Sequence, residues 1–476
     1  MTAPDFYRIT PRVVGAGETV EIAISGNYPH TDLRTLSGPL TVEAVGGDGL
    51  FRNGDLPGFT CGNGFDLGRP PREPVADTTA DGAGVLRFRY DFRCEGECSF
   101  RLRQGERVLT EFSIYALRKE WLDLRPFRGD LHLHSGYSCC NRDPERLSPE
   151  YYAAANCARG LDFICISDHK QYFPSRKAED FARQCGGDFR VYPSEEIHLP
   201  DLHNIHELNF GGDRPVSSQL HRGIAAYDRD LAAFLKRVPA WNDEYCRYMA
   251  ANFHIIYERV HEADGLVVFC HPFWRPRKWL FLPRPVREYV LEHRLYDALE
   301  LYGDGQQNCD ETEAMYFEQC MKEGRRIPAV GNTDAHELEN LAKNSTVIFA
   351  RSNEFPELRK SLLANLNVAV NGLTGDFPRT SGPLELVSFY HFLRMNYYPR
   401  HDALNARAGE AMFQTLAAGE PDPRYGEFIH QPYPKHVDGD PKAWTRNRFA
   451  PTPLMADVQK EKTALEQEFW GEQSRV

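Results

Sequence analysis

Three features that would place the chain in other classes of protein are missing from its 476 residues. No apolar run approaches the ~20 residues that a membrane-spanning helix needs. The first residues carry neither the basic segment nor the apolar core of a secretory signal. Positive charge is also scarce: 56 Lys and Arg face 68 Asp and Glu, for a net charge of −12, whereas binding extended nucleic acid requires basic patches. We therefore expect a cytoplasmic protein whose partner is neither a membrane nor an extended nucleic acid.

Cysteine is present but shows no disulfide pattern. The 12 cysteines lack the regular spacing of a small disulfide-stapled domain, and reduced thiols are the default for a cytosolic chain. The C-x3-C pair formed by Cys94 and Cys98 is weak evidence for a metal site. We interpret it as two thiols that flank a turn.

The chain divides into three regions by its patterns, and its length allows two to four domains at ~100–200 residues each. Residues 1–118 contain short runs that alternate with period two between Gly, Pro and Asp clusters, which predicts an all-β, immunoglobulin-like sandwich. Residues 119–376 alternate apolar strands with helical segments, a pattern typical of parallel α/β units. Residues 377–476 are predicted to form a helical and Pro-rich C-terminal extension.

A long, mostly helical insertion, residues 217–263, separates two predicted strands of the second region. It is longer than a barrel crossover requires. Its length fits either a lid over the site or a contact between identical chains. In the second case the protein would be a homo-oligomer.

Histidine is concentrated in the second region. Of the 17 histidines, twelve lie from His132 to His336 and one precedes them. In the segment Gly129-Asp-Leu-His-Leu-His-Ser135, His132 and His134 are two residues apart. On a strand both imidazoles would face the same side and reach one ion.

Ligand-type residues also follow most of the later strand candidates. The carboxyl ends of barrel strands meet at one rim, where such enzymes place their active sites. Six histidines and two carboxylates that meet there cannot form an apolar core, because each buried polar group needs a partner. A site for several metal ions is the simplest interpretation. The segments are Ser167-Asp-His169, Ser194-Glu-Glu196, His203-Asn-Ile-His206, His271-Pro272 and Thr333-Asp-Ala-His336.

These motifs, in this order, resemble the PHP (polymerase and histidinol phosphatase) family of metal-dependent phosphoesterases. The match spans residues 129–336 and rests on Gly129-Asp-Leu-His-Leu-His-Ser135, Ile166-Ser-Asp-His169, Glu196, His206, Cys270-His-Pro272 and Gly331-Asn-Thr-Asp-Ala-His336. Further phrases resemble the carbaryl-hydrolase-like branch, whose members tend to carry an N-terminal β-domain. They are Leu124-Arg-Pro-Phe-Arg-Gly-Asp-Leu-His132, Ser194-Glu-Glu-Ile-His198, Asn209-Phe-Gly-Gly212, His271-Pro-Phe-Trp274 and Thr346-Val-Ile-Phe-Ala350.

The resemblance implies a distorted (β/α)7 barrel with two to three divalent ions, which we expect to be Zn, Mn or Fe. Glu196 would bridge two ions, and Glu196, Asp334 and His206 are the predicted catalytic residues. The implied ligand sets are His132, His134, Glu196 and Asp334 for the first ion, Glu196, His206 and His271 for the second, and His169 and His336 for the third.

The ninth ligand is where the sequence departs from the family. The family usually has Asp or His shortly after the serine of the first motif, whereas Ser138 is followed here by Cys139, Cys140 and Asn141. A thiolate from Cys139 or Cys140 would favour Zn over Mn, because soft sulfur prefers the softer ion. Asp143 is an alternative ligand, and a weak or empty third site is another. We take Cys139 as the predicted ninth ligand.

Other polar residues lie beside these motifs. Three carboxylates are predicted to orient the metal ligands by hydrogen bonding from behind them: Asp130, Asp168 and Glu300. His198 either lines the pocket or lies on the surface, and His203 is expected to play no part. Four cations are candidates to bind an anionic substrate, with solvated surface as the alternative: Lys170, Arg142, Arg275 and Arg277.

The predicted function is hydrolysis of a small molecule by a metal-bridging hydroxide at a di- or trinuclear site. A phosphoester is the favoured substrate. A carboxyl ester, amide or carbamate is the alternative, since the same hydroxide attacks a carbonyl and the aromatic residues Tyr172, Phe173 and Trp274 suit an acyl or aryl group. A non-catalytic binding scaffold is a further alternative, although such a relic should have lost ligands. An ordinary amidohydrolase barrel is disfavoured, because it normally ends on a single Asp.

Overall fold

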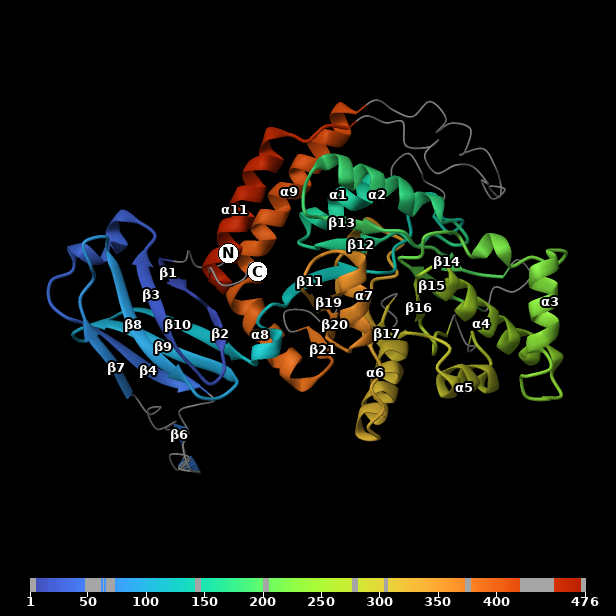
Figure 1. Cartoon of the computed structure of the whole chain (residues 1–476), viewed down its shortest axis with the longest axis horizontal. Helices are drawn as coiled ribbons and strands as arrows, with labels where there is room; N and C mark the ends of the chain where they lie inside the picture. The colour runs from blue at the N-terminus through green and yellow to red at the C-terminus, as the bar shows by residue number, and fades with distance from the viewer. Residues whose placement is uncertain are drawn as a thin grey trace. The chain divides into compact units, whose positions relative to one another are not determined.

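A computed structural model gives the fold (Figure 1). It describes residues 6–47, 61–62, 64–65, 73–141, 147–199, 205–275, 281–303, 307–372, 378–419 and 449–471. The chain forms two compact units, each described here by itself. The first comprises Met1–Leu124, Ser388–His401 and Lys460–Val476, and the second comprises Arg125–Val387 and Asp402–Gln459.

Two sheets form the N-terminal part of the first unit. The three-stranded sheet has the order β1-β3-β8, and the five-stranded sheet has the order β2-β10-β9-β4-β7. Burial alternates along β9, as the period-two sequence pattern predicts. The inward side chains of both sheets, such as Ile22, Phe88 and Phe100, share one core. The strands are β1 (Tyr7–Thr10), β2 (Val13–Gly15), β3 (Glu18–Gly26), β4 (Leu40–Gly47), β7 (Glu73–Thr78), β8 (Val85–Phe92), β9 (Gly96–Gln104) and β10 (Arg107–Leu117), with a separate pair β5 (Cys61–Gly62) and β6 (Gly64–Phe65).

Three C-terminal helices contribute segments to both units: α8 (Leu384–Asn396), α9 (Tyr398–Ala418) and α11 (Pro453–Trp470). Within the first unit, the ring of Tyr115 on β10 lies 4.9 Å from that of Phe389 on α8. The backbone N–H of Arg12 donates to the carbonyl of Phe469 on α11 over 2.8 Å. The predicted Pro-rich run spans residues 421–453, and most of it lies outside the described residues, which resume at residue 449.

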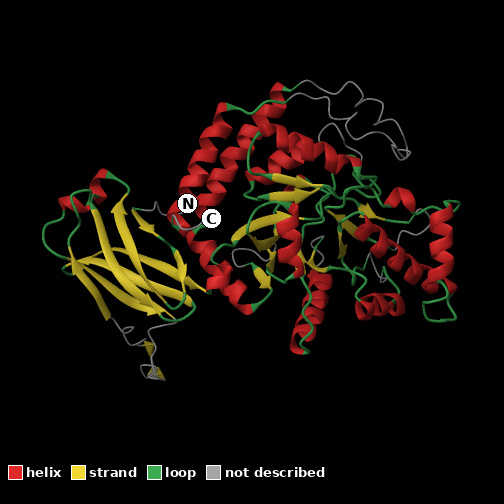
Figure 2. Ribbon diagram, viewed as in Figure 1, coloured by secondary structure: helices red, strands yellow, loops and turns green. Residues whose placement is uncertain are grey.

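The strands of the second unit form two sheets with one interior (Figure 2). The six-stranded sheet has the order β13-β12-β11-β19-β20-β21, and the five-stranded sheet has the order β14-β15-β16-β17-β18. Phe163, Val268 and Ile348, which come from strands of both sheets, lie in one buried cluster. The strands are β11 (Arg125–Asp130), β12 (Phe163–Cys165), β13 (Arg190–Tyr192), β14 (Glu196–Ile197), β15 (Glu207–Phe210), β16 (Leu266–Phe269), β17 (Ala298–Tyr302), β18 (Ala329–Gly331), β19 (Asn344–Ala350), β20 (Asn367–Asn371) and β21 (Arg379–Ser381).

The sequence pattern predicted parallel α/β units in this region, and that expectation is only partly met. β11, β12 and β13 are parallel neighbours, as are β16, β17 and β18. β15 runs antiparallel to β14 and β16, and β19 runs antiparallel to β11 and β20. Only residues 198–206 connect β14 to β15, too few for the crossover that a parallel pair needs. The result is a mixed α/β unit with a half-barrel sheet.

Two isolated parallel bridges, Leu133 with Ala335 and His169 with Glu196, join the two sheets beyond the carboxyl ends of β11 and β12. They bring the histidine-rich segments together.

The helices of the second unit lie around these strands (Figure 2). α1 begins at Pro149 because the side chain of Ser148 accepts a hydrogen bond from the N–H of Tyr151, and α4 is capped in the same way by Asp243. The insertion contains α3 and α4, and α4 buries one face in the core. None of the described helices is long and apolar enough to cross a membrane. The helices are α1 (Pro149–Ala158), α2 (Phe173–Cys185), α3 (Ala225–Phe234), α4 (Glu244–Glu262), α5 (Arg284–His293), α6 (Gln307–Lys322) and α7 (Phe355–Leu363).

Candidate metal centre

The predicted ligands come together at one end of the half-barrel. His132 and His134 follow β11, His169 follows β12, and His271 follows β16. His206 is placed differently, because it precedes β15. Since β15 is antiparallel to its neighbours, its amino end lies at the same rim as their carboxyl ends.

Glu196 is the centre of this group. It is 1% exposed, and its two carboxylate oxygens face different sets of imidazoles. Oε1 lies 2.6 Å from Nδ1 of His206 and 3.7 Å from Nε2 of His271. Oε2 faces the other set: Nδ1 of His169 at 2.6 Å, Nε2 of His134 at 3.4 Å, and Nε2 of His132 and His198 at 3.5 Å each. One carboxylate thus has the placement of a ligand shared by two ions.

Asp334 lies on the same side as Oε2 of Glu196. Its Oδ1 is 2.8 Å from Nε2 of His134 and 3.2 Å from Nε2 of His132. The φ angles of Asp334 (46°) and His271 (25°) lie in the left-handed region, which non-glycine residues rarely adopt. Such strain persists at functional sites where the surroundings fix the side-chain direction.

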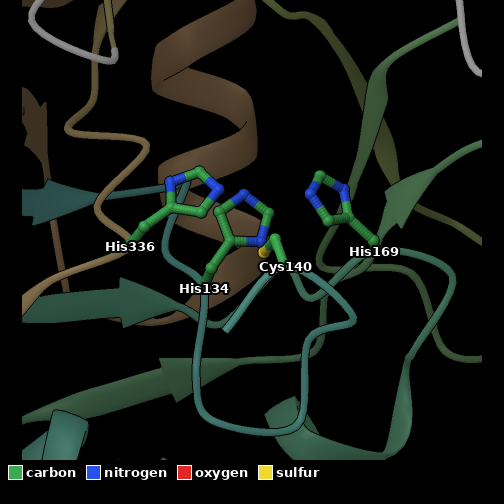
Figure 3. Close-up of side chains that lie close together, drawn as sticks. All are labelled: His134, Cys140, His169 and His336. Atoms are coloured by element: carbon green, nitrogen blue, oxygen red, sulfur yellow. The ribbon is translucent and has the colours of Figure 1, made fainter. Parts of the chain in front are cut away.

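Cys140 belongs to a second group with His134, His169 and His336 (Figure 3). Their potential ligand atoms all lie within 4.8 Å of one another. His134 lies between the other two imidazoles, since its ring is 4.4 Å from the ring of His169 and 4.4 Å from that of His336.

The sequence-based choice of Cys139 as ninth ligand is therefore replaced by its alternative. Both cysteines are exposed, but Cys140 lies in a candidate metal group and Cys139 takes part in none of the groups found among the described residues. The turn after Ser138 directs the side chain of Cys140 toward the histidines instead. Asp143, the other alternative, lies outside the described residues.

Several buried ligand atoms lack hydrogen-bond partners. Among the described residues, Nε2 of His132, Nε2 of His134, both carboxylate oxygens of Glu196 and Oδ1 of Asp334 are buried without one. Buried polar atoms of this kind are normally satisfied by protein, water or an ion. Imidazole nitrogens and carboxylate oxygens that lie 2.8–3.5 Å from one another are the donor atoms that divalent metal ions take in proteins. The residues present therefore fit divalent metal ions.

Burial and neighbouring groups shift the pKa values of several residues in the centre. Burial would raise the pKa of Asp334, but His132 and His134 hold it well below its usual range. Burial lowers the pKa of His134 to about 3, so this imidazole is neutral and able to bind an ion at physiological pH. Burial would also raise the pKa of the Cys140 thiol, but hydrogen bonds with His169 and His336 lower it to about 6. Thiolates are the metal-binding form of cysteine.

Glu300 supports the centre from behind. Its Oε1 lies 3.1 Å from Nδ1 of His132 and accepts from the side-chain amide of Asn332 over 2.7 Å. Its Oε2 accepts from the backbone N–H of His271 over 2.9 Å. A proton held on Nδ1 of His132 leaves Nε2 free to bind an ion. This geometry matches the predicted orienting role.

We expect Glu300→Gln to weaken metal binding by about 10- to 100-fold, the usual cost of losing an orienting partner. The new amide would oppose one of the three N–H groups that now point at the carboxylate. Competition with a chromophoric chelator measures the affinity, and Glu311→Gln on the exposed face of α6 is the matched control. Equal affinities of the two variants would contradict the role.

Asp130 and Asp168 orient backbone rather than imidazoles. Asp130 accepts from the N–H groups of His132 and Thr333, and Asp168 accepts from the N–H of Ser135 over 2.6 Å. Burial raises the pKa of each carboxyl to about 7. Both residues fasten the segments that carry the ligands.

Two of the four predicted substrate-binding cations lie in the described part of the chain. Lys170 is half-buried next to His169 and has a left-handed φ of 59°. Arg275 is exposed four residues after His271. Arg142 and Arg277 lie outside the described residues, as does His203.

The sequence left the place of His198 open and did not predict the pair of aromatic residues around His206. His198 is buried, with Nε2 2.7 Å from Nδ1 of His169; its separation of two residues from Glu196 was the signal. Trp274 and Phe281 form an aromatic wall, with rings 5.8 and 4.7 Å from that of His206. Nothing in the sequence connects Phe281 with the motif that contains Trp274.

Fold and site together define a mixed α/β protein with a candidate centre for several metal ions. No protein-family model matches the chain, and no curated protein matches it either.

Solved structures that match part of the chain include PHP-like metal-dependent phosphoesterases. A two-domain protein containing a predicted PHP-like phosphoesterase from Bacteroides vulgatus is 13% identical over 52% of this chain and 66% of its own, with a TM-score of 0.36. A protein from Bifidobacterium adolescentis assigned to the metal-dependent phosphoesterases is 16% identical over 49% and 95%, with a TM-score of 0.33. A lesion-specific endonuclease from Pyrococcus furiosus is 18% identical over 53% and 61%, with a TM-score of 0.31. With TM-scores below 0.5, these likenesses carry no argument, and the function proposed below rests on the site itself.

Proposed function

We propose that the chain is a metal-dependent hydrolase with a di- or trinuclear centre, most simply a phosphoesterase of the PHP type on a distorted (β/α)7 barrel. The observation that carries the proposal is Glu196, whose two buried oxygens face two sets of imidazoles. The order of the sequence motifs supports the family, and the phrases around them support its carbaryl-hydrolase-like branch.

The residues that would hold the ions follow from these distances. In this proposal His132, His134 and Asp334, which form one candidate metal group, hold one ion. His206 and His271, which lie near Oε1 of Glu196, hold another, and Glu196 is shared by both. When bound, Zn, Mn or Fe at such a centre lowers the pKa of water toward neutrality and stabilises negative charge on the substrate.

The protein's own groups prepare this chemistry. Glu300 fixes the ring of His132, and Asp168 fixes the turn that begins at Ser135. His198 is an additional imidazole that can hold or pass a proton at Nε2, 2.7 Å from Nδ1 of His169. Low exposure of Glu196 and Asp334 strengthens every charge interaction in the centre, because the local dielectric is low.

A carboxyl ester, amide or carbamate is the second candidate substrate. The aromatic wall favours it: Trp274 lies 5.1 Å from His271 and 4.6 Å from Phe281 between ring centroids. The buried Nε1 of Trp274 has no hydrogen-bond partner among the described residues. An aryl or acyl group against this wall would leave the indole N–H to donate to a substrate oxygen.

Turnover of three nitrophenyl compounds separates the two substrate classes. The metal-loaded protein is assayed with p-nitrophenyl phosphate, bis-p-nitrophenyl phosphate and p-nitrophenyl acetate under Zn, Mn and Fe. Metal-dependent turnover of either phosphate supports the phosphoesterase, and turnover of the acetate alone supports the second candidate. Bound metal with no turnover of any of the three would favour the non-catalytic scaffold.

If the second candidate is correct, Trp274→Leu should raise KM for the aryl ester about 10-fold, the value of ~1–2 kcal/mol of lost aromatic contact. kcat should change less, because Trp274 belongs to none of the candidate metal groups found among the described residues. Trp241→Leu, at a tryptophan that packs on Tyr289 instead, is the control for steady-state kinetics. An unchanged KM would remove the aromatic wall from the argument.

A further inference from the structure

The group around Cys140 differs in chemistry from the rest of the centre. Every other candidate metal group among the described residues includes a carboxylate, from Glu196, Glu300 or Asp334. The Cys140 group offers one sulfur and three imidazoles and no carboxylate. Carboxylates suit Mg and Mn, whereas thiolates select Zn and other soft ions. The two sides of the centre therefore differ in the metals they should prefer.

The position of the thiol is fixed from both sides of its turn. The Cys140 thiol donates to Oγ of Ser138 over 3.0 Å, and the same Oγ accepts from the backbone N–H of His169 over 3.3 Å. The side-chain amide of Asn141 donates to the backbone carbonyl of His336 over 3.0 Å. Hydrogen bonds thus connect the turn to two of the histidines in the group.

The separation of the ligand atoms suits a single ion. In a tetrahedral zinc site with Zn–N bonds of about 2.0–2.1 Å and Zn–S bonds of about 2.3 Å, the ligand atoms lie roughly 3.3–3.7 Å apart. The four residues already place theirs within 4.8 Å of one another (Figure 3).

We propose that Cys140, with His169 and His336 and beside His134, forms a thiolate metal site that selects zinc, while the carboxylate side around Glu196 and Asp334 accepts harder ions such as Mn. The centre is then of mixed composition when both metals are available. This inference rests on the metal binding in the proposed function, but not on the bond that is cleaved.

Cys139 provides a matched control. It is adjacent to Cys140 and equally a cysteine, yet it takes part in none of the metal groups found among the described residues. Cys140→Asp is a second informative variant, since it keeps an ionised ligand at the position but replaces sulfur with oxygen.

Metal competition tests the selectivity. The wild-type chain, Cys140→Ser, Cys140→Asp and Cys139→Ser are stripped, dialysed against Zn with a ~100-fold excess of Mn, and analysed by mass spectrometry of the elements. The wild type and Cys139→Ser should each retain about one zinc ion per chain, and Cys140→Ser should lose it. Cys140→Asp should exchange that zinc for Mn. Circular dichroism checks that each variant is folded.

Substitution with cobalt shows directly, in the wild-type chain, whether a thiolate binds the ion. Co²⁺ bound by a thiolate shows a sulfur-to-cobalt charge-transfer absorption in the near ultraviolet, which imidazole and carboxylate ligands do not produce. We expect this absorption in the wild type and in Cys139→Ser, and its loss in Cys140→Ser and Cys140→Asp.

Two results would overturn the inference. One is a metal-loaded wild-type chain whose cobalt form lacks thiolate absorption. The other is a Cys140→Ser chain that keeps all of its zinc against excess Mn. Either result leaves the proposed hydrolase intact as long as metal is bound. A wild-type chain that binds no metal ion would instead overturn both proposals.

Discussion

Glu196→Gln is expected to lower kcat/KM by more than about 100-fold, because losing a ligand should cost more than the 10–100-fold typical of losing a ligand's hydrogen-bond partner. The two oxygens of Glu196 face His206 and His271 on one side and His169, among others, on the other. A neutral amide offers one oxygen in place of two and removes the negative charge between them. The affinity for both ions should therefore fall together.

Steady-state kinetics and metal analysis of the same preparation check this expectation. Glu311→Gln, the exposed change on α6, controls for loss of one surface charge. Far-ultraviolet circular dichroism should be the same for both variants, since neither change removes apolar packing. A Glu196→Gln protein with wild-type metal content and wild-type turnover would exclude a bridging role for this carboxylate.

Removal of the metal ions should abolish turnover and lower Tm by about 10 °C. An ion present at 1,000 times its Kd stabilises the native state by about 4 kcal/mol, and each kcal/mol is worth roughly 2–4 °C in a unit of this size. The physical reason is the buried cluster of imidazoles and carboxylates, in which Nε2 of His132 and His134 and both oxygens of Glu196 lack hydrogen-bond partners among the described residues. Ions that bind the native state alone restore those interactions.

Differential scanning calorimetry before and after treatment with a chelator measures the shift. Adding Zn or Mn back should restore both Tm and activity, which separates metal loss from irreversible damage. A chelated chain that keeps its activity would exclude metal-dependent catalysis.

The rim of the centre could be predicted from the sequence because strand geometry is local. Period two predicted His132 and His134 on one face of a strand, whereas β11 ends at Asp130 and both residues lie in the segment that follows it. The rule that residues after parallel strands meet at one edge still brings them to the rim. His206 does not follow from that rule, since it precedes an antiparallel strand; only the family motif identified it. The antiparallel course of β15 and β19 depends on connection length and tertiary packing, which the apolar patterns do not encode.

The choice between Cys139 and Cys140 shows where sequence reasoning ends. Adjacent residues point in different directions, so a turn decides which thiol faces the histidines. Here the decision follows from two long-range hydrogen bonds: the backbone N–H of His169 donates to Oγ of Ser138, and the side-chain amide of Asn141 donates to the carbonyl of His336. The approach of Phe281 to His206 is likewise a property of the folded chain, because it depends on the loop that separates Phe281 from Trp274.

Metal analysis of the full chain, purified without chelator and without added metal, tests the central claim most directly. The geometry around Glu196 predicts about two to three divalent ions per chain, as in multinuclear hydrolases. A content well below one ion per chain, unchanged after incubation with Zn, Mn or Fe, would contradict the metal centre and the hydrolase proposed on it.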